Sequence, residues 1–310
     1  MTEQQQLSKR RAAVVINPSK AIDQNFKTDL LQLFTQADWA EPLWLETTVE
    51  DPGTGQSRQA LEAGVDVVMA AGGDGTVRCV AEVLAGTGTA MALVPLGTGN
   101  LLARNLNIEI NSPLRAAEDA ISGTETKIDV VRAVIDHGKR QQLFLVAAGL
   151  GYDAAIMGGT VDQLKDRVGW LAYVEAGIRN LPGKAVTATI TVDGKRTTHR
   201  RVRSVMVGNC GRLMGGLEIF PDALVDDGIL DLLILAPRGR LGWLRVVAGV
   251  FSKGSRGNTS VQSLTGKVAE ITLDRPQEFQ LDGDHAETAS HLRVAVDPQA
   301  LTVRKAPARK

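Results

Sequence analysis

The first half of the chain alternates apolar runs with amphipathic stretches, and this alternation restricts its fold more than any other feature. The apolar runs expected as buried strands cover residues 12–17, 65–72 and 90–97, and the expected helices cover 26–37 and 77–86. Strands that alternate with helices form a parallel sheet, because two parallel strands need a long crossover connection. We therefore predict an α/β domain over residues 1–130.

The second half has a different pattern. Its apolar runs often alternate with polar residues and are separated by Gly, Asp and Pro turns; they cover 185–194, 201–209, 228–236, 268–284 and 291–306. This pattern predicts a β-rich, mostly antiparallel domain over residues 131–295, with a tail from about 296 to 310 that packs back on the first domain. Two further helices are expected at 161–181 and 240–251.

Composition excludes several classes of protein. The 310 residues carry 35 basic and 35 acidic side chains and are 44% hydrophobic, which argues against a duplex-DNA binder and against a disordered chain. Cys79 and Cys210 lie far apart without His or Cys neighbours, so a disulfide framework or zinc site is not expected. No run approaches the length of a transmembrane segment, and we expect a cytoplasmic protein without a nucleic-acid partner.

Three loops that follow predicted strands carry polar or glycine-rich sequences. They are NPSK from Asn17, GGDGT at 72–76 and PLGTGN at 95–100. In an open α/β sheet, ligands bind at the carboxyl ends of the strands, where these loops would lie.

The GGDGT loop has the composition of a phosphate site. Gly72, Gly73 and Gly75 would let backbone N–H groups approach a ligand, and Thr76 adds a hydroxyl next to the positive end of a helix. Asp74 would repel a phosphate unless a divalent cation or a hydroxyl group lay between them. Taken alone, the motif also fits a glycine-rich turn with a capping aspartate.

The PLGTGN loop repeats this composition after the next strand. Gly97 and Gly99 allow close backbone approach, and Thr98 and Asn100 supply hydrogen-bonding groups. Two such loops after neighbouring strands favour a phosphate-binding cleft. The loops match neither the Walker A pattern nor the dinucleotide-binding fingerprint.

Together these motifs resemble the bacterial diacylglycerol kinase and sphingosine kinase family of lipid kinases, whose nucleotide domain is similar to those of NAD kinase and phosphofructokinase. The resemblance continues in the second half, and it covers nearly the whole chain. The motifs there are AAGLGYDA (147–154), GNCGRLMGG (208–216), PDALVDDGILDL (221–232) and LDGD (281–284).

The resemblance implies ATP and Mg²⁺ as cofactors and direct phosphoryl transfer as the mechanism. It implies that Asn17 and Thr48 contact the nucleotide, and that Asp129 joins a hydrated metal network. The residues implied to hold the phosphates and metal or to line the same cleft are Gly72, Gly73, Asp74, Gly75, Thr76, Gly97, Thr98, Gly99 and Asn100.

Asp282 in LDGD matches the family's catalytic aspartate and is the expected base for the lipid hydroxyl. Two residues depart from the family pattern. Asp284 stands where Glu is usual, and Leu101 stands where many relatives carry an acid. One carboxylate of the metal network is therefore expected to be missing. Without the resemblance, LDGD reads as an Asp-Gly hairpin turn.

The segment LVDDGIL also has two interpretations. It is either a turn between strands or, as the resemblance implies, a structural divalent-metal site. That site would use the Asp227 side chain with the carbonyls of Leu224 and Ile229, because oxygen ligands suit Mg²⁺ or Ca²⁺.

A lipid kinase without a transmembrane segment has to meet its substrate at a bilayer surface. Residues 237–257 contain several cations and no acid, with Arg238, Arg240 and Arg245 near Trp243 and Phe251. Cations attract anionic headgroups and Trp favours the interface. A helix packed on the sheet with solvated arginines is the other interpretation, and we expect both to hold.

The resemblance therefore implies an ATP- and Mg²⁺-dependent lipid kinase that transfers the γ-phosphate to a lipid hydroxyl. Its bacterial character favours diacylglycerol, converted to phosphatidic acid, and leaves sphingoid bases, ceramide and phosphatidylglycerol open as substrates. We expect a cytoplasmic protein, peripheral at the inner membrane face, and a homodimer is compatible with the sequence. The alternatives are an enzyme like NAD kinase and a nucleotide-binding regulator with weakened catalysis, the latter suggested by Leu101 and Asp284.

Overall fold

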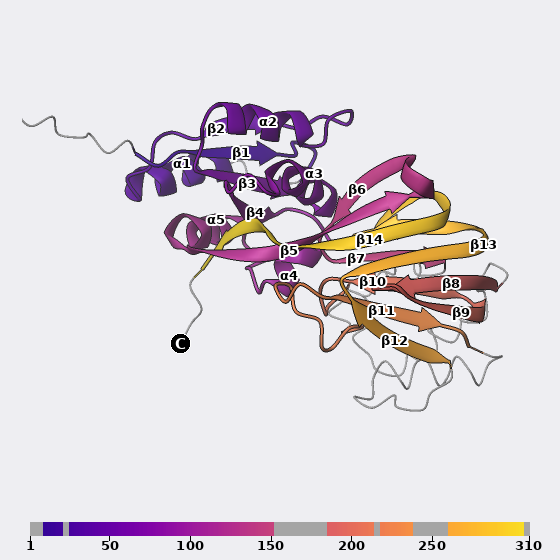
Figure 1. The fold of residues 1–310 in the computed structure, drawn as a ribbon. Helices are drawn as coiled ribbons and strands as arrows, with labels where there is room; N and C mark the ends of the chain where they lie inside the picture. The colour runs from indigo at the N-terminus through magenta and orange to yellow at the C-terminus, as the bar shows by residue number, and fades with distance from the viewer. Residues whose placement is uncertain (1–8, 21–24, 152–184, 214–217, 238–259, 307–310) are drawn as a thin grey trace, which may run out of the picture. The chain divides into compact units, whose positions relative to one another are not determined.

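The computed structural model describes residues 9–20, 25–151, 185–213, 218–237 and 260–306 (Figure 1). It divides into two compact units: Met1–Ile128 with Ala300–Lys310, and Asp129–Gln299. The helices predicted at 161–181 and 240–251, and nearly all of the basic segment 237–257, lie outside the described residues. The predicted fold class is confirmed, with an α/β first unit and a β-rich, mostly antiparallel second unit.

The first unit is built on a parallel sheet with strand order β4-β3-β1-β2. Its strands are β1 (Ala12–Ile16), β2 (Leu43–Glu46), β3 (Val67–Gly72) and β4 (Ala90–Pro95). Strands β1, β3 and β4 are buried along their whole length, as expected for a sheet covered on both faces. The register pairs Ile16 with Ala71 and Gly72 with Pro95, so the loops after these strands leave from one edge of the sheet.

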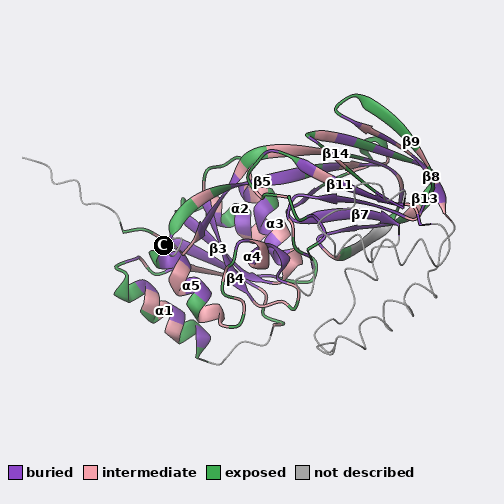
Figure 2. Ribbon diagram, turned by 90° about the horizontal axis from the view of Figure 1, so that it is seen from below, coloured by how far each residue is buried: buried purple, intermediate pink, exposed green. Residues whose placement is uncertain are grey.

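The helices of this unit each bury one side, as the purple faces of the ribbon show in Figure 2. Helix α1 packs Phe26, Leu30 and Phe34 into the core of the sheet. Helix α5 begins where the Ser112 hydroxyl accepts the Arg115 N–H, with a proline in its first turn. The helices are α1 (Phe26–Gln36), α2 (Thr54–Glu62), α3 (Asp74–Leu84), α4 (Leu101–Asn105) and α5 (Pro113–Ser122).

The C-terminal end of strand β14 belongs to the first unit. There Val303 pairs in parallel with Met91 of β4. The buried Arg304 donates from Nε to the Ala120 carbonyl at 2.7 Å and from Nη2 to the Ile121 carbonyl at 3.2 Å. These carbonyls lie in the last turn of α5, where a cation is favourable.

The second unit is a β-sandwich whose strand pairings are antiparallel. Strands β5 and β14 also extend into the first unit, because the chain crosses between the units at 128–129 and 299–300. The strands are β5 (Thr124–Ile135), β6 (Arg140–Phe144), β7 (Ala147–Gly151), β8 (Val186–Val192), β9 (Lys195–Val202), β10 (Ser204–Gly208), β11 (Leu230–Leu235), β12 (Val261–Gly266), β13 (Val268–Leu281) and β14 (Asp284–Lys305).

Strand register separates the two faces of the sheet formed by β13, β7, β10 and β11. Residues that pair directly across antiparallel strands carry their side chains on the same face. One row contains Leu281, Ala148, Val207 and Leu232, all members of the hydrophobic core of the sandwich. The adjacent row therefore faces away from that core, and it contains Gln280, Gly149, Met206 and Leu233.

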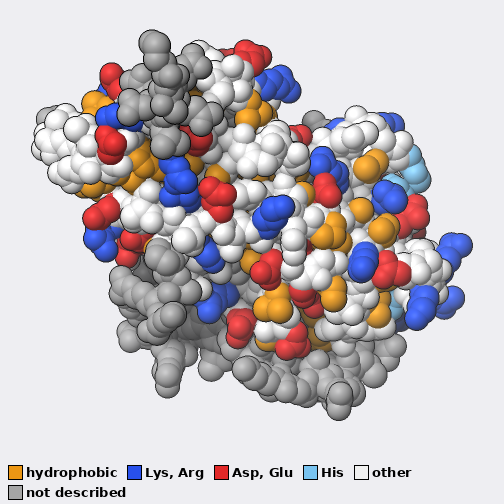
Figure 3. Space-filling view, turned by 60° about the vertical axis from the view of Figure 1, so that its left-hand side comes forward, with side chains coloured by type: hydrophobic (Ala, Val, Ile, Leu, Met, Phe, Trp, Pro, Cys, Tyr) orange, Lys and Arg blue, Asp and Glu red, His pale blue; other side chains and the backbone are white. Residues whose placement is uncertain are grey.

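The surface of the molecule carries no single-sign field on the face drawn in Figure 3, where Lys and Arg side chains are interspersed with Asp and Glu. This agrees with the equal numbers of basic and acidic residues in the chain.

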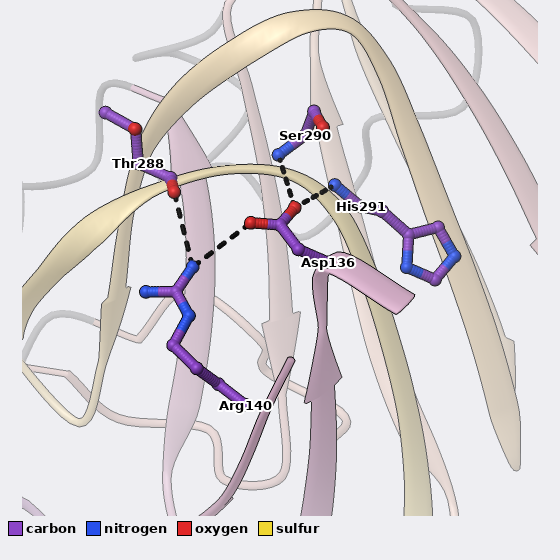
Figure 4. A network of polar contacts seen from close by, with 5 residues as sticks. All are labelled: Asp136, Arg140, Thr288, Ser290 and His291. Carbon is purple, nitrogen blue, oxygen red and sulfur yellow. Dashed lines mark hydrogen bonds and ion pairs between the residues drawn. The ribbon is translucent and has the colours of Figure 1, made fainter. Parts of the chain in front are cut away.

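A polar network fastens the turn after β5 to strand β14 (Figure 4). One oxygen of Asp136 accepts the N–H groups of Ser290 and His291 at 3.1 and 3.2 Å, and the other lies 3.2 Å from Arg140. Arg140 also donates to the Thr288 carbonyl. Burial opposes ionisation of Asp136, but the two N–H groups and the guanidinium outweigh it and hold the pKa of this carboxyl below its usual value.

We predict that Asp136→Asn destabilises the protein at neutral pH by about 1 kcal/mol, because the charged hydrogen bonds weaken. A lowered folded-state pKa gives stability that is present above the unfolded pKa and is lost as pH falls through the folded pKa. The melting-temperature difference between variant and parent should therefore shrink in acid. Asp297→Asn, which removes an exposed ion pair with Arg132, is the matched control and should change little. An equal difference at pH 7 and in acid would contradict the assignment.

Candidate functional site

The GGDGT loop forms the junction between β3 and α3. Strand β3 ends at Gly72, Gly73 is the N-cap and the helix begins at Asp74. A Cβ on Gly72 would lie 2.6 Å from the Thr76 Cβ, so no larger residue fits there. The first N–H groups of a helix have no acceptor within the helix, so this turn presents donors and the positive end of the dipole.

The PLGTGN loop lies directly against GGDGT. Leu96 donates its N–H to the Gly72 carbonyl at 2.9 Å, and a Cβ on Gly97 would lie 2.7 Å from the Gly73 Cα. Asn100 adopts a left-handed conformation with φ of 47° and closes the loop with two hydrogen bonds to the Gly97 backbone. The structure therefore brings the two predicted glycine-rich loops together, and this close contact leaves no room for a side chain at Gly97.

Asp74 joins the two loops through its carboxylate. One oxygen accepts the Leu101 N–H at 2.6 Å, and a Cβ on Gly99 would lie 2.5 Å from the other oxygen. The Leu101 side chain is buried, with 1% of its surface exposed. Leu101 therefore contacts Asp74 through its backbone N–H, while its side chain packs in the apolar interior.

Asn17 and Thr48 follow β1 and β2 at the same edge of the sheet. Asn17 donates its N–H to the Ala71 carbonyl at 2.9 Å, and its side-chain oxygen accepts the Ser19 N–H and hydroxyl. The Thr48 hydroxyl accepts the Asp51 N–H at 3.1 Å. Thr98 is exposed in the second glycine-rich loop. The predicted nucleotide residues of the first unit thus lie at the carboxyl ends of its strands, in the loops that follow them or in the first turn of α3.

Asp282 occupies the turn between β13 and β14. Asp282 and Gly283 have φ values of 48° and 86°, and Leu281 pairs with Asp284, so LDGD is the two-residue hairpin turn that an Asp-Gly pair favours. The side chain also makes long-range contacts. Its carboxylate accepts the N–H groups of Leu145, Val146 and Ala147 at 2.9, 2.8 and 3.1 Å, and 4% of the residue is exposed.

Asn209 holds the other side of the 145–147 segment and was not among the predicted site residues. Its side-chain amide donates to the Leu145 carbonyl at 2.9 Å, and its backbone N–H donates to the Val146 carbonyl at 2.8 Å. Asn209 is fully buried and belongs to the GNCGRLMGG motif, to which the sequence assigned no particular role. The next residue is Cys210. Its burial, and to a lesser extent the charges of Asp282 and Asp129, raise the pKa of its thiol, which disfavours the nucleophilic thiolate.

Asp129 is buried and braces two segments of the second unit. Its carboxylate oxygens accept the Gly228 N–H at 2.6 Å and the Gln299 N–H at 2.7 Å. The implied part of Asp129 in a metal network stays a prediction, and its hydrogen bonds show that it shapes the 224–229 loop.

The 224–229 loop is a turn before β11. Asp227 accepts the Ile229 N–H at 3.0 Å, and Leu224 and Ile229 are exposed by 59% and 37%. A single carboxylate with two backbone carbonyls is the donor set predicted from the sequence. Within the described ranges, no cluster of three or more His, Cys, Asp or Glu side chains suits a metal ion.

The acidic side chains around this turn repel one another. Burial, followed by the charges of Asp227 and Asp222, raises the pKa of Asp231 to about 6. Burial and the neighbouring charges of Asp129 and Asp226 also raise the pKa of Asp227. The negative potential at the 224–229 turn would be relieved by a divalent cation.

The predicted site residue Asp284 lies at the start of β14, where it is exposed.

The first unit is therefore an α/β domain with paired glycine-rich loops, and the second is an antiparallel β-sandwich that contains the hydrogen-bonded Asp282. Residues 11–133 match the diacylglycerol kinase catalytic domain, and residues 146–305 match the YegS C-terminal NAD kinase beta sandwich-like domain. The chain belongs to the YegS-like family of lipid kinases.

Relatives of known sequence cover nearly the whole chain. A probable lipid kinase YegS-like protein of Pseudomonas fluorescens is 28% identical over 96% of this chain and 96% of its own length. A diacylglycerol kinase of Bacillus subtilis is 27% identical over 89% of this chain and 90% of its own. The crystal structure of a putative diacylglycerol kinase from Bacillus anthracis has a TM-score of 0.74 at 21% identity, covering 97% and 98% of the two chains, and shows the same fold.

None of the helices in the described part of the chain is both long and apolar enough to cross a membrane. The predicted docking residues Arg238, Arg240 and Arg245 lie outside that part.

We predict that Asp231→Asn stabilises the protein at pH 8 and has no effect near pH 3. Because the pKa of this carboxyl is higher in the folded state, native stability falls as pH rises through the window between about 4 and 6. Asp231 is partly exposed, so solvent screening limits the gain to about 1 kcal/mol. Thermal melts of the parent protein and of Asp231→Asn at several pH values between 3 and 8 measure this difference in stability. A gain that persists at pH 3 would mean that the charge is not its cause.

Proposed function

We propose that this protein is an ATP- and Mg²⁺-dependent lipid kinase that transfers the γ-phosphate of ATP to the free hydroxyl of diacylglycerol. Membership of a lipid kinase family supports the reaction class. The observation that carries the proposal is the contact between GGDGT and PLGTGN, because glycine backbones and the start of α3 surround the Asp74 carboxylate. The diacylglycerol kinase named among its relatives supports the lipid.

In the proposed complex, backbone N–H groups of the two glycine-rich loops bind the phosphates of ATP. Gly72, Gly73, Gly75 and Thr76 supply the first loop, with its donors at the start of a helix. Gly97, Thr98, Gly99 and Asn100 supply the second loop. Asn17 and Thr48 contact the rest of the nucleotide from the ends of β1 and β2.

The residues present fit Mg²⁺ near Asp74. A carboxylate oxygen is the ligand type that this ion prefers, and Asp74 lies among backbone donors that suit phosphates. When bound, the ion would neutralise charge on the β- and γ-phosphates. Leu101 has no carboxylate and its side chain is buried, so it would not be a ligand of this ion.

Asp282 is proposed to accept the hydrogen bond of the lipid hydroxyl. Phosphoryl transfer has a loose transition state, so positioning of the nucleophile counts for more than the strength of the base. Three backbone N–H groups fix the direction of this carboxylate. Asp284, two residues further on and exposed, is proposed to assist at the same hairpin.

The remaining predictions complete the proposal. The protein is expected to be cytoplasmic and to act at the inner membrane face, and a homodimer stays a prediction. An NAD kinase-like activity is less well supported, because the first half of the chain matches the diacylglycerol kinase catalytic domain and the relatives are lipid kinases. A regulator without catalysis would need the proposed phosphate site but would make no product.

We predict that Asp74→Asn and Asp282→Asn each lower kcat/KM for diacylglycerol phosphorylation at least ~100-fold, because each removes a charge at the reacting groups. Asp284→Asn should cost about tenfold or less, since it acts from an exposed position. Transfer of labelled phosphate from ATP to diacylglycerol and to NAD measures all three. Glu62→Gln, an exposed acid at the C-terminal end of α2, is the control. Labelled NAD, or ATP binding without any lipid product, would contradict the proposal.

We propose further that the 224–229 loop binds a structural divalent cation through Asp227 and the carbonyls of Leu224 and Ile229. Millimolar Ca²⁺ or Mg²⁺ should then raise the melting temperature of the parent protein and not that of Asp227→Asn, since ligands stabilise the state that binds them. Asp226→Asn, a neighbouring acid, is the matched control and should keep the response. A response that survives Asp227→Asn would place the cation elsewhere.

A further inference from the structure

Gln280 is a buried polar residue on the sheet face that points away from the sandwich core. It pairs with Gly149 of β7, which pairs with Met206 of β10. Only 2% of Gln280 is exposed, and its side-chain nitrogen finds no acceptor among the residues that the structure describes. Buried amides in folded proteins normally have partners, so an amide without one needs an explanation, and a bound polar group would supply one.

A second buried polar atom without a partner lies on the same face. Ser204 of β10 is 2% exposed, and its hydroxyl has no hydrogen-bond partner in the described part of the chain. Ser204 pairs with Gly151 and lies two residues before Met206, so it shares the face of Gln280. Two unpaired polar groups on one buried face favour a bound polar group over a local defect.

Gln280 lies close to the proposed base along the chain. The Asp282 N–H donates to the Ala147 carbonyl, which continues the pairing of β13 with β7 beyond Leu281. Asp282 itself lies in the hairpin turn that follows β13, two residues beyond Gln280. Cα atoms two residues apart in an extended chain lie about 6–7 Å from each other, so a hydroxyl bound at Asp282 lies near Gln280.

We propose that Gln280 is a specificity residue that donates its side-chain N–H to an ester carbonyl of a glycerolipid substrate. The inference rests on the proposed function, in which Asp282 receives the lipid hydroxyl. In a 1,2-diacylglycerol an ester group is attached to the carbon next to the one that bears the reacting hydroxyl. Gln280 at the end of β13 and Asp282 in the turn that follows are two residues apart, which suits two neighbouring groups of one substrate.

The test compares 1,2-dioctanoylglycerol with 1,2-di-O-octylglycerol, which has the same hydroxyl and chains of equal carbon number but no ester carbonyl. The parent protein should favour the ester lipid in kcat/KM by roughly tenfold to a hundredfold, because the ether leaves the buried donor unpaired. Gln280→Leu should lose most of this preference, mainly through KM for the ester lipid. It should also raise the melting temperature, since it removes a buried amide without a partner.

Gln277→Leu is the matched control, because Gln277 lies on the same strand and its side-chain nitrogen already donates to the Pro276 carbonyl. It should keep the ester preference. Gln280→Met, which is similar in shape and lacks the donor, gives the same readout if Gln280→Leu does not fold. Equal rates of the parent protein on the two lipids, or a Gln280→Leu variant with full ester preference, would overturn the inference while leaving the kinase proposal intact. Phosphorylation of neither lipid would refute both.

Discussion

The hydrogen bonds between the Asp282 carboxylate and the N–H groups of Leu145, Val146 and Ala147 organise the second unit around its proposed catalytic residue. They tie the β13–β14 turn to the segment that links β6 and β7. Asn209 binds the carbonyl side of that segment. A buried carboxylate is costly unless it is hydrogen-bonded, so the turn, the segment and Asn209 depend on one another.

In the first unit, glycine residues allow a carboxylate to lie close to the backbone. Asp74 must lie close to backbone groups of two loops, and the contacts at Gly72, Gly97 and Gly99 leave no room for a Cβ. The carboxylate is held by the Leu101 N–H, so its position is fixed by the loops themselves. In the proposed reaction one unit positions phosphates and the other positions a hydroxyl, each with a carboxylate that the backbone orients.

Much of the fold could be predicted from the sequence, since the apolar runs at 12–17, 65–72 and 90–97 became β1, β3 and β4. Helix α3 begins at Asp74, earlier than the predicted start at 77, because Gly73 caps it. The predicted strand at 201–209 is shorter, since Arg201 has a φ of 61° and β10 begins at Ser204. The two glycine-rich loops could be recognised because the residues of each loop are consecutive in the sequence. The partners of Asp282 and the part played by Asn209 were not, because these contacts join residues more than sixty positions apart.

Amide hydrogen exchange at Leu145, Val146 and Ala147 tests the central claim most directly. Asp282→Gly removes the carboxylate and tolerates the positive φ of this position. Our account predicts that these three amides exchange slowly in the parent protein and much faster in the variant, while Val205 in the middle of β10 stays protected in both. Equal protection of the three amides in the two proteins would show that the Asp282 carboxylate does not hold this segment, and would contradict the account.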